Sequence, residues 1–218
     1  MEPVYRALAA RTAALPHSEL LRLRRQWTSF NLDEYVGLGP GDPRSFATEM
    51  AERLVMPLGL DPLQVRLPDG RAPDPDLEAR RYATELASAG GIGLQLLGLG
   101  LNGHVAFNEP PCGPGARCRC VELSEGTRHR NSETIPGLQG GPGVPERAIS
   151  LGLLEILAAG SLLLVVTGSA KASILRRSLL EPPSATVPAS WLQTHPSLTV
   201  LADQEAVAAI DRGPGRSS

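Results

Sequence analysis

The stretch "GGIGLQLLGLGLNGHVAFNEP", residues 90–110, decides the fold class of this chain. Its first part, Ile92 to Leu99, is an apolar run bounded by glycines, which is typical of a parallel strand covered on both faces. A loop that carries Asn102, His104 and Glu109 follows the run at once. In open α/β sheets, ligands bind beyond the carboxyl ends of the strands. We therefore expect a buried strand that ends in a functional loop.

The rest of the sequence alternates between strand-like and helix-like segments. Apolar runs of strand length are followed by helical patterns, with Gly and Pro between them. This alternation predicts an α/β fold with an open, doubly wound, mainly parallel sheet of the Rossmann-like kind. We predict helices at residues 4–14, 45–54, 76–89 and 169–180, strands at 26–32, 92–99, 161–168 and 197–203, and a strand followed by a helix within 144–160. We expect Asp76 to cap the helix at 76–89.

Length and composition indicate one globular domain. The chain has 218 residues, of which 42% are hydrophobic and 20% are charged, and this suffices for a sizeable core. We predict a single domain over residues 1–207 and a flexible tail over 208–218. The glycine-rich segment 137–143 is the other stretch that we expect to be flexible.

Charge and hydropathy point to a small-molecule partner. A net charge of −2 and a pI near 6.1 give no positive field for nucleic acid or for an anionic membrane. The most apolar stretch, Leu151 to Val166, is interrupted by Glu155 and is shorter than the roughly 20 residues that span a bilayer. No secretory signal is visible at the start. We expect a soluble protein that binds neither nucleic acid nor a membrane.

The three cysteines argue against a disulfide framework. Cys112, Cys118 and Cys120 are odd in number and lie in one segment, and a zinc site would need a fourth ligand and a familiar spacing. We interpret them as reduced structural cysteines. This predicts a cytoplasmic protein without a metal site.

Three polar residues follow predicted strands, and each has a structural and a functional interpretation. Asp33 is a turn former or helix cap in one and a catalytic carboxylate in the other. His104 is either a hydrogen-bonded loop residue or a base, and Gly100 and Gly103 beside it would allow a tight backbone approach. Either Asn102 or Glu109 could orient its imidazole.

The third residue, Lys171, is the only lysine among 21 basic residues. A single lysine can arise by chance, but this position follows a strand and opens a predicted helix. An ammonium beside a helix N-terminus is suited to bind an anion. The carboxyl ends of parallel strands would bring these three residues to one rim of the sheet.

Four segments of the chain resemble the signature blocks of the glucosamine-6-phosphate deaminase (isomerase) family. They are "FNLDEYVGL" at 30–38, "GLGLNGHVAFNEP" at 98–110, "GSAKA" at 168–172 and "PASWLQTHP" at 188–196. The likeness covers the chain from Val4 to about Val207. The ending Phe107 to Pro110 is similar to the deaminases and differs from the related 6-phosphogluconolactonases.

The resemblance implies conversion of a 2-amino sugar phosphate to fructose 6-phosphate with loss of ammonia. By resemblance, His104 would open the sugar ring with Asn102 and Glu109 holding it. Asp33 would move the proton from C2 to C1, and Lys171 would bind the phosphate. Because the substrate amine activates the adjacent carbon, neither a metal nor an organic cofactor is implied. Since an amide such as Asn102 takes no proton, the role of base falls to His104 with Glu109 as its partner.

One residue departs from the family pattern. Family members carry a phosphate-binding arginine after an Asn-Ser pair, whereas Glu133 follows Asn131 and Ser132 here. A carboxylate about 5 Å from a phosphate charge costs roughly 3 kcal/mol at an effective dielectric of 20. Either Glu133 turns outward and Arg128 or Arg130 takes its place, or the substrate differs, or catalysis is weakened.

The start of the chain also departs from the pattern. In the family, a first strand and a Gly/Thr-rich phosphate loop precede the helix that "MEPVYRAL" matches. We expect the fold to lack this strand, which would leave an open sheet edge next to the strand before Asp33 and next to the strand before Gly100. An open edge invites association, so a homo-oligomer is compatible with the sequence. Either Met1 is an internal start or the chain is shortened.

Three functions follow from these observations. The first is an amino-sugar phosphate deaminase, which the four residues Asp33, His104, Glu109 and Lys171 favour. The second is a non-catalytic sugar-phosphate-binding paralogue, suggested by Glu133 and by the absent loop. The third is a lactonase of the related branch.

Overall fold

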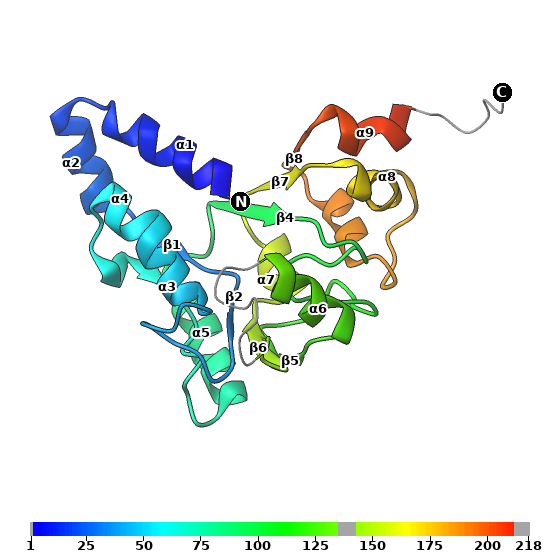
Figure 1. Ribbon diagram of the computed structural model, residues 1–218, viewed down its shortest axis with the longest axis horizontal. Helices are drawn as coiled ribbons and strands as arrows, with labels where there is room; N and C mark the ends of the chain where they lie inside the picture. Colours follow the sequence, from blue (N-terminus) through cyan, green and yellow to red (C-terminus); the bar gives the residue numbers. More distant parts are fainter. Residues whose placement is uncertain (1, 135–142, 212–218) are drawn as a thin grey trace. The chain divides into compact units, whose positions relative to one another are not determined.

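The computed structural model describes residues 2–134 and 143–211 (Figure 1). The chain divides into two compact units, each of which is described by itself. Unit 1 comprises residues 2–82, 120–134 and 143–149, and unit 2 comprises 83–119 and 150–211. The assignment of residues 1–207 to a single domain stays a prediction. Of the two stretches expected to be flexible, 137–142 and 212–218 lie outside the described residues.

Unit 2 contains a three-stranded parallel sheet in the order β4-β7-β8. Its strands are β4 (Leu94–Gly98), β7 (Ser161–Val166) and β8 (Leu198–Ala202), and helix α8 (Ala172–Leu180) connects the last two. All three strands lie within the predicted segments (Figure 1). The predicted α/β fold with an open parallel sheet is therefore confirmed.

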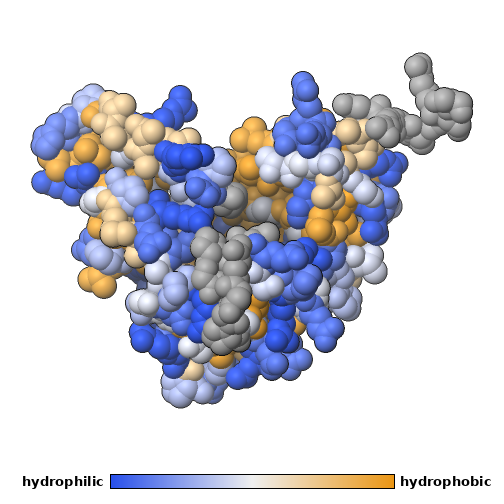
Figure 2. Space-filling view, viewed as in Figure 1, coloured by the Kyte–Doolittle hydropathy of each residue, from blue (hydrophilic) through white to orange (hydrophobic). Residues whose placement is uncertain are grey.

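One face of this sheet is closely packed. Leu97, Leu162 and Leu164 on that face are at most 1% exposed. The opposite face is less covered, because Leu94 is 62% exposed and Leu201 is 54% exposed. Hydrophobic patches, drawn in orange, reach the surface around β7 and α8 in Figure 2. The expectation of full burial on both faces is wrong for the ends of the outer strands.

Short helical segments complete unit 2. They are α7 (Leu153–Leu157), the 3-10 helices η3 (Ser169–Lys171) and η4 (Pro188–Thr194), and α9 (Gln204–Asp211). Helix α9 corrects the predicted tail, because residues 208–211 are helical. The alanines of this segment have high helix propensity, and Ala206 is fully buried. Asp203 accepts a hydrogen bond from the Ala206 amide at 2.8 Å and so caps the helix.

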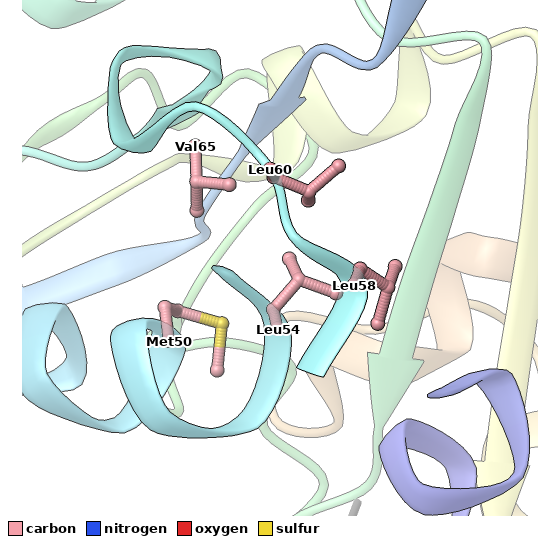
Figure 3. Close-up of a cluster of buried hydrophobic side chains, with 5 residues drawn as sticks. All are labelled: Met50, Leu54, Leu58, Leu60 and Val65. Atoms are coloured by element: carbon pink, nitrogen blue, oxygen red, sulfur yellow. The ribbon is translucent and has the colours of Figure 1, made fainter. Parts of the chain in front are cut away.

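Helices form the core of unit 1. The helices α1 (Glu2–Ala13) and α2 (His17–Gln26) are followed by a helical stretch made of α3 (Phe46–Met50), the π-helical η1 (Ala51–Val55) and α4 (Met56–Leu58). A 3-10 turn, η2, spans Pro62–Gln64. The buried cluster shown in Figure 3 consists of Met50, Leu54, Leu58, Leu60 and Val65.

The strands of unit 1 are short. Strand β1 (Ser29–Phe30) pairs in parallel with β3 (Val65–Arg66), and β2 (Asp33–Tyr35) lies in a second sheet of order β2-β6-β5. The other members of that sheet are β6 (Arg147–Ser150) and β5 (Arg119–Glu122).

The predicted strand at 26–32 is wrong in its first half, because helix α2 continues to Gln26. Arg24 anchors this last turn by donating a hydrogen bond from Nε to the Leu58 carbonyl at 2.7 Å. The contact joins segments 34 residues apart, so local sequence patterns do not reveal it.

Two further helices remain, one that begins in unit 1 and continues into unit 2 and one that lies in unit 1. Helix α5 (Pro75–Ser88) matches its prediction within one residue, but Asp74 caps it instead of Asp76: Asp74 Oδ1 accepts hydrogen bonds from the amides of Asp76 at 3.0 Å and Leu77 at 2.9 Å. Helix α6 (Glu125–Thr134) was not predicted.

Strands β4 and β1 each lie at the end of their sheets. In the described part of the chain, β4 pairs only with β7 and β1 pairs only with β3. Each strand therefore has one edge without a strand partner among these residues, as do the strands at the other ends of the sheets. None of the described helices is both long and apolar enough to cross a membrane.

Gly152 leaves room for the chain at the start of α7. A Cβ atom built at this position would overlap the backbone of Ala116 and Arg117. The Ala116 carbonyl in turn accepts a hydrogen bond from the Leu154 amide at 2.9 Å. We expect Gly152→Ala to lower the free energy of unfolding by about 1–3 kcal/mol, because the backbone must shift to relieve the overlap. Urea unfolding measures this change.

The matched control is Gly93→Ala in the same unit, where a Cβ would meet no atom within 4 Å. Equal stability of the two variants would contradict the proposed steric role of Gly152.

Candidate active site

The loop after β4 is a tight turn. The Gly100 amide donates to the His104 carbonyl at 2.9 Å, and the Gly103 amide donates to the Gly100 carbonyl at 3.1 Å. Gly103 has φ +85°, a conformation that favours glycine. A Cβ atom at this position would also lie only 2.9 Å from Val187 Cγ1, which is a steric overlap. The glycines of this segment therefore determine the path of the loop.

His104 is held by an amide oxygen in this loop. Its Nδ1 lies 2.6 Å from Asn102 Oδ1, and the His104 backbone amide donates to the same oxygen at 3.2 Å. Because that oxygen is an acceptor, Nδ1 of a neutral His104 carries the proton. The lone pair then lies on Nε2, which makes Nε2 the basic atom.

Glu109 is the second partner of His104. Its Oε1 is 3.9 Å from His104 Nδ1, and the side chains of the two residues are only 14% and 17% exposed. At this distance Glu109 acts on the imidazole through its charge, while Asn102 fixes the tautomer. The structure thus brings Asn102, His104 and Glu109 together within one loop.

Asn108 holds the far half of this loop, and the sequence analysis did not single it out. The residue is fully buried, and Nδ2 donates to the carbonyls of Val105 at 3.1 Å and Leu151 at 2.9 Å. Its Oδ1 accepts from Arg119 at 3.0 Å. The position of Asn108 next to Glu109 was the only signal of this role in the sequence.

Lys171 lies beside the start of the same loop. It ends η3, and its Nζ donates to the Leu99 carbonyl at 2.6 Å. Carboxylates occupy the nearby backbone amides that we expected to bind an anion: Asp203 accepts from Gly168 at 2.9 Å and Glu205 accepts from Ser169 at 3.3 Å. These two amides therefore do not serve as the anion site.

Asp33 lies in unit 1, at the first position of β2. Burial raises the pKa of Asp33 from 3.8 to about 8, and the negative charges of Glu34 and Glu49 add to this effect. A carboxylate that titrates near the working pH is suited to accept and return a proton.

Helix α6 carries the two arginines that we expected to replace the family's phosphate ligand. Arg128 is 3.6 Å from Glu146 Oε1, and its buried Nε has no hydrogen-bond partner among the described residues. Glu133 is 62% exposed and lies 3.3 Å from His129 Nε2. Glu133 therefore points to solvent, as one of the three alternatives requires. Arg130 lies on the same helix.

The structure thus places the predicted residues in two sets. Unit 2 holds Asn102, His104, Glu109 and Lys171, and unit 1 holds Asp33, Arg128 and Arg130. Among the described residues, no group of three or more His, Cys, Asp or Glu side chains could hold a metal ion. Within the described residues, Cys112, Cys118 and Cys120 form no disulfide.

Comparison with known proteins places this chain in a family. Residues 1–201 match the family described as glucosamine-6-phosphate isomerases/6-phosphogluconolactonase. A glucosamine-6-phosphate deaminase of Geobacillus sp. is 40% identical over 186 residues, which is 85% of this chain and 73% of the relative. The deaminase of Rhodopirellula baltica is 41% identical over 187 residues, or 86% of this chain and 73% of the relative.

Solved structures agree with this assignment. A structure described as a monomeric glucosamine-6-phosphate deaminase superposes with a TM-score of 0.82 at 36% identity and covers 95% of this chain and 83% of its own. The 6-phosphogluconolactonase of Leishmania guyanensis, at 19% identity, TM-score 0.69 and coverage of 99% and 83%, shares the fold.

The parallel sheet with polar loops at its strand ends is the architecture of a ligand-binding α/β protein. The match over residues 1–201 and the relatives near 40% identity make the assignment specific: the chain belongs to the glucosamine-6-phosphate isomerase/6-phosphogluconolactonase family.

The raised pKa of Asp33 makes stability depend on pH. Between pH 4 and 8 the unfolded Asp33 is ionised while the folded one is protonated, so the folded state binds more protons. The free energy of unfolding must fall as pH rises through this window, by at most about 1.4 kcal/mol per pH unit for one proton. Asp33→Asn removes this contribution. We expect the variant to gain melting temperature relative to the parent at pH 8.5, and less so at pH 5.

Thermal unfolding at both pH values measures the difference. An equal gain at pH 5 and pH 8.5 would show that Asp33 titrates normally.

Gly100 sets the orientation of the His104 ring. A Cβ atom at Gly100 would overlap the Cε1, Nδ1 and Nε2 atoms of His104, whereas a Cβ at Gly98 would meet nothing within 4 Å. We expect Gly100→Ala to displace the imidazole and to break its bond to Asn102. NMR of labelled histidine should show changed His104 resonances in this variant and nearly unchanged ones in Gly98→Ala. Equal spectra of the two variants would remove Gly100 from this role.

Proposed function

We propose that this chain converts glucosamine 6-phosphate to fructose 6-phosphate and ammonia. Curated relatives at 40–41% identity carry the name glucosamine-6-phosphate deaminase, and the chain spans 73% of the length of these two proteins. The observation that carries the proposal is the pair of proton-handling groups: the His104 imidazole oriented by Asn102, and the Asp33 carboxylate that titrates near pH 8.

Ring opening is the first step. His104 Nε2 takes the proton of the anomeric hydroxyl and returns it to the ring oxygen, so that the C1 aldehyde forms. Asn102 keeps the proton of the imidazole on Nδ1, and the nearby Glu109 charge stabilises the imidazolium.

Isomerisation follows at C1 and C2. Asp33 removes the C2 proton of the open-chain sugar while the substrate ammonium gives a proton to O1, which yields a neutral enolamine, and Asp33 then delivers its proton to C1. The product carries an iminium at C2. Water adds there and ammonia leaves, so one water is consumed for each ammonia released. An ionised Asp33 starts this sequence, so its turnover must rise with pH towards 8.

Cations recognise the phosphate in this proposal. Lys171 in unit 2 and Arg128 and Arg130 in unit 1 are the candidates, because Glu133 points to solvent. The buried Nε of Arg128 supports this role, since it lacks a hydrogen-bond partner among the described residues. The three cysteines, which form no disulfide in the described part of the chain, fit a cytoplasmic setting. Association into a homo-oligomer stays a prediction, which light scattering tests.

Ammonia release from glucosamine 6-phosphate tests the function. We expect the parent chain to release ammonia and Asp33→Asn to lose about 10²–10⁴-fold in kcat with little change in KM, because the carboxylate acts on the transition state. Lys171→Ala should instead raise KM. The exposed Arg22→Ala is the control and should leave both constants unchanged.

Hydrolysis of 6-phosphogluconolactone without ammonia release would establish the lactonase alternative. Sugar-phosphate binding without turnover would establish the non-catalytic one.

A further inference from the structure

Strand β2 consists of three residues whose side chains leave it on two sides. Asp33 and Tyr35 point to one side and Glu34 points to the other, because side chains alternate along a strand. Glu34 is 1% exposed and Tyr35 is fully buried. Neither residue has a role in the chemistry proposed above. Both are nevertheless polar and buried, so their partners require an explanation.

The Glu34 carboxylate binds three backbone amides. Its Oε1 accepts from Phe46 at 3.1 Å and from Tyr35 at 2.8 Å, and its Oε2 accepts from Ala47 at 2.8 Å. Phe46 and Ala47 form the first turn of α3, where the helix dipole favours a negative charge. Ser45 already caps the Thr48 amide at 3.1 Å. Glu34 therefore ties β2 to a helix that has its own cap.

Tyr35 is fixed from the other side of the strand. Its hydroxyl accepts a hydrogen bond from Asn131 Nδ2 at 2.8 Å, and its ring stacks on Phe46 with centroids 5.0 Å apart. Asn131 lies on α6, the helix that carries Arg128 and Arg130. Glu34 therefore holds the strand to α3, and Tyr35 contacts both α3, through Phe46, and α6, through Asn131.

We propose that Glu34 is a positioning residue for Asp33: its carboxylate clamps β2 to the start of α3 and fixes the backbone that presents the catalytic carboxylate. The inference rests on the proposed deaminase function. Tyr35 and Asn131 hold the opposite side of the strand, so the release of Glu34 alone leaves the strand attached to α6.

The clamp also places a negative charge beside Asp33. The charged groups that raise the pKa of Asp33 are Glu34 and, more weakly, Glu49, which itself pairs with Arg53 at 3.2 Å. Burial raises the pKa of the Tyr5 and Tyr35 phenols, and the negative charge of Asp33 adds to this effect at both. Removal of the Glu34 charge must lower the pKa of Asp33, and activity that needs ionised Asp33 then extends to lower pH.

Two substitutions separate the clamp from the charge. Glu34→Asp keeps the charge but is one methylene too short to reach both Phe46 and Ala47. Glu34→Gln keeps the length but removes the charge. Glu49→Gln is the matched control. It removes another negative charge that raises the pKa of Asp33, but the Glu49 side chain pairs with Arg53 and is not the group that ties β2 to α3. The experiment measures kcat and kcat/KM for ammonia release from pH 5.5 to 9.5, with the folded fraction of each variant determined by thermal unfolding.

The expected results differ between the variants. Glu34→Asp should lose about 10- to 100-fold in kcat at high pH, where Asp33 is fully ionised, because the carboxylate is misplaced. The acid limb of its profile should stay near that of the parent. Glu34→Gln should move this limb to lower pH. Glu49→Gln should move it less and keep the high-pH kcat.

Two results would overturn the inference. The first is an unchanged high-pH kcat of folded Glu34→Asp. The second is the following combination. The activity of each Glu34 variant falls only in proportion to its folded fraction, and the low-pH side of the Glu34→Gln activity profile lies at the same pH as that of the parent. Should Glu34→Gln not fold, Glu34→Asp alone decides the question. If the parent releases no ammonia, the proposed function is wrong. The effect of the Glu34 charge on the pKa of Asp33 is then measured from the pH dependence of the free energy of unfolding. In that case Glu34→Gln should narrow the pH window over which the free energy of unfolding falls, and an unchanged window overturns the charge effect.

Discussion

The arrangement of unit 1 depends on two neighbouring carboxylates, the partly buried Asp33 and the fully buried Glu34. Moving an ionised carboxylate out of water is unfavourable unless hydrogen-bond donors of the protein replace the water molecules. The Glu34 carboxylate accepts hydrogen bonds from three backbone amides, those of Tyr35, Phe46 and Ala47. Burial raises the pKa of both carboxyl groups, but three backbone amides oppose this effect at Glu34, whereas the nearby negative charges of Glu34 and Glu49 add to it at Asp33. This difference arises from the alternation of side chains along β2, which sends the two groups to opposite sides.

In unit 2, one side-chain oxygen positions the candidate base His104. A single oxygen of Asn102 accepts from both the backbone and the ring of His104, so the loop conformation and the imidazole tautomer are fixed together. An aspartate at this position would accept the same bonds but would add a charge next to Glu109. With the neutral amide, one carboxylate near the ring suffices to favour the imidazolium during proton transfer.

Much of this arrangement could be predicted from sequence, and the exceptions have physical causes. The strands β4, β7 and β8 are short, mainly apolar segments of the sequence, so the hydrophobic pattern identifies them. Helix α6, with the sequence "EGTRHRNSET", has no apolar periodicity. A tertiary contact, the bond from Asn131 to Tyr35 across 96 residues, holds it. For the same reason the loop residues of the candidate site could be named from their motif, whereas the Glu34 clamp could not, because its partners are backbone amides that any sequence supplies.

The choice of lysine at position 171 follows from what surrounds it. Asp203 and Glu205 already occupy the amides of Gly168 and Ser169, so the backbone at the end of β7 has little capacity left for an anion. Lys171 supplies positive charge from a flexible stem that reaches the Leu99 carbonyl at 2.6 Å. An ammonium is a compact charge on a flexible stem, which suits a site where the cation must reach a single carbonyl oxygen. The contact also joins Lys171 to the first residue after β4. The ammonium is thereby held at the start of the loop that carries His104. The backbone of residues 99–104 then fixes the position of any phosphate bound by Lys171 relative to the imidazole.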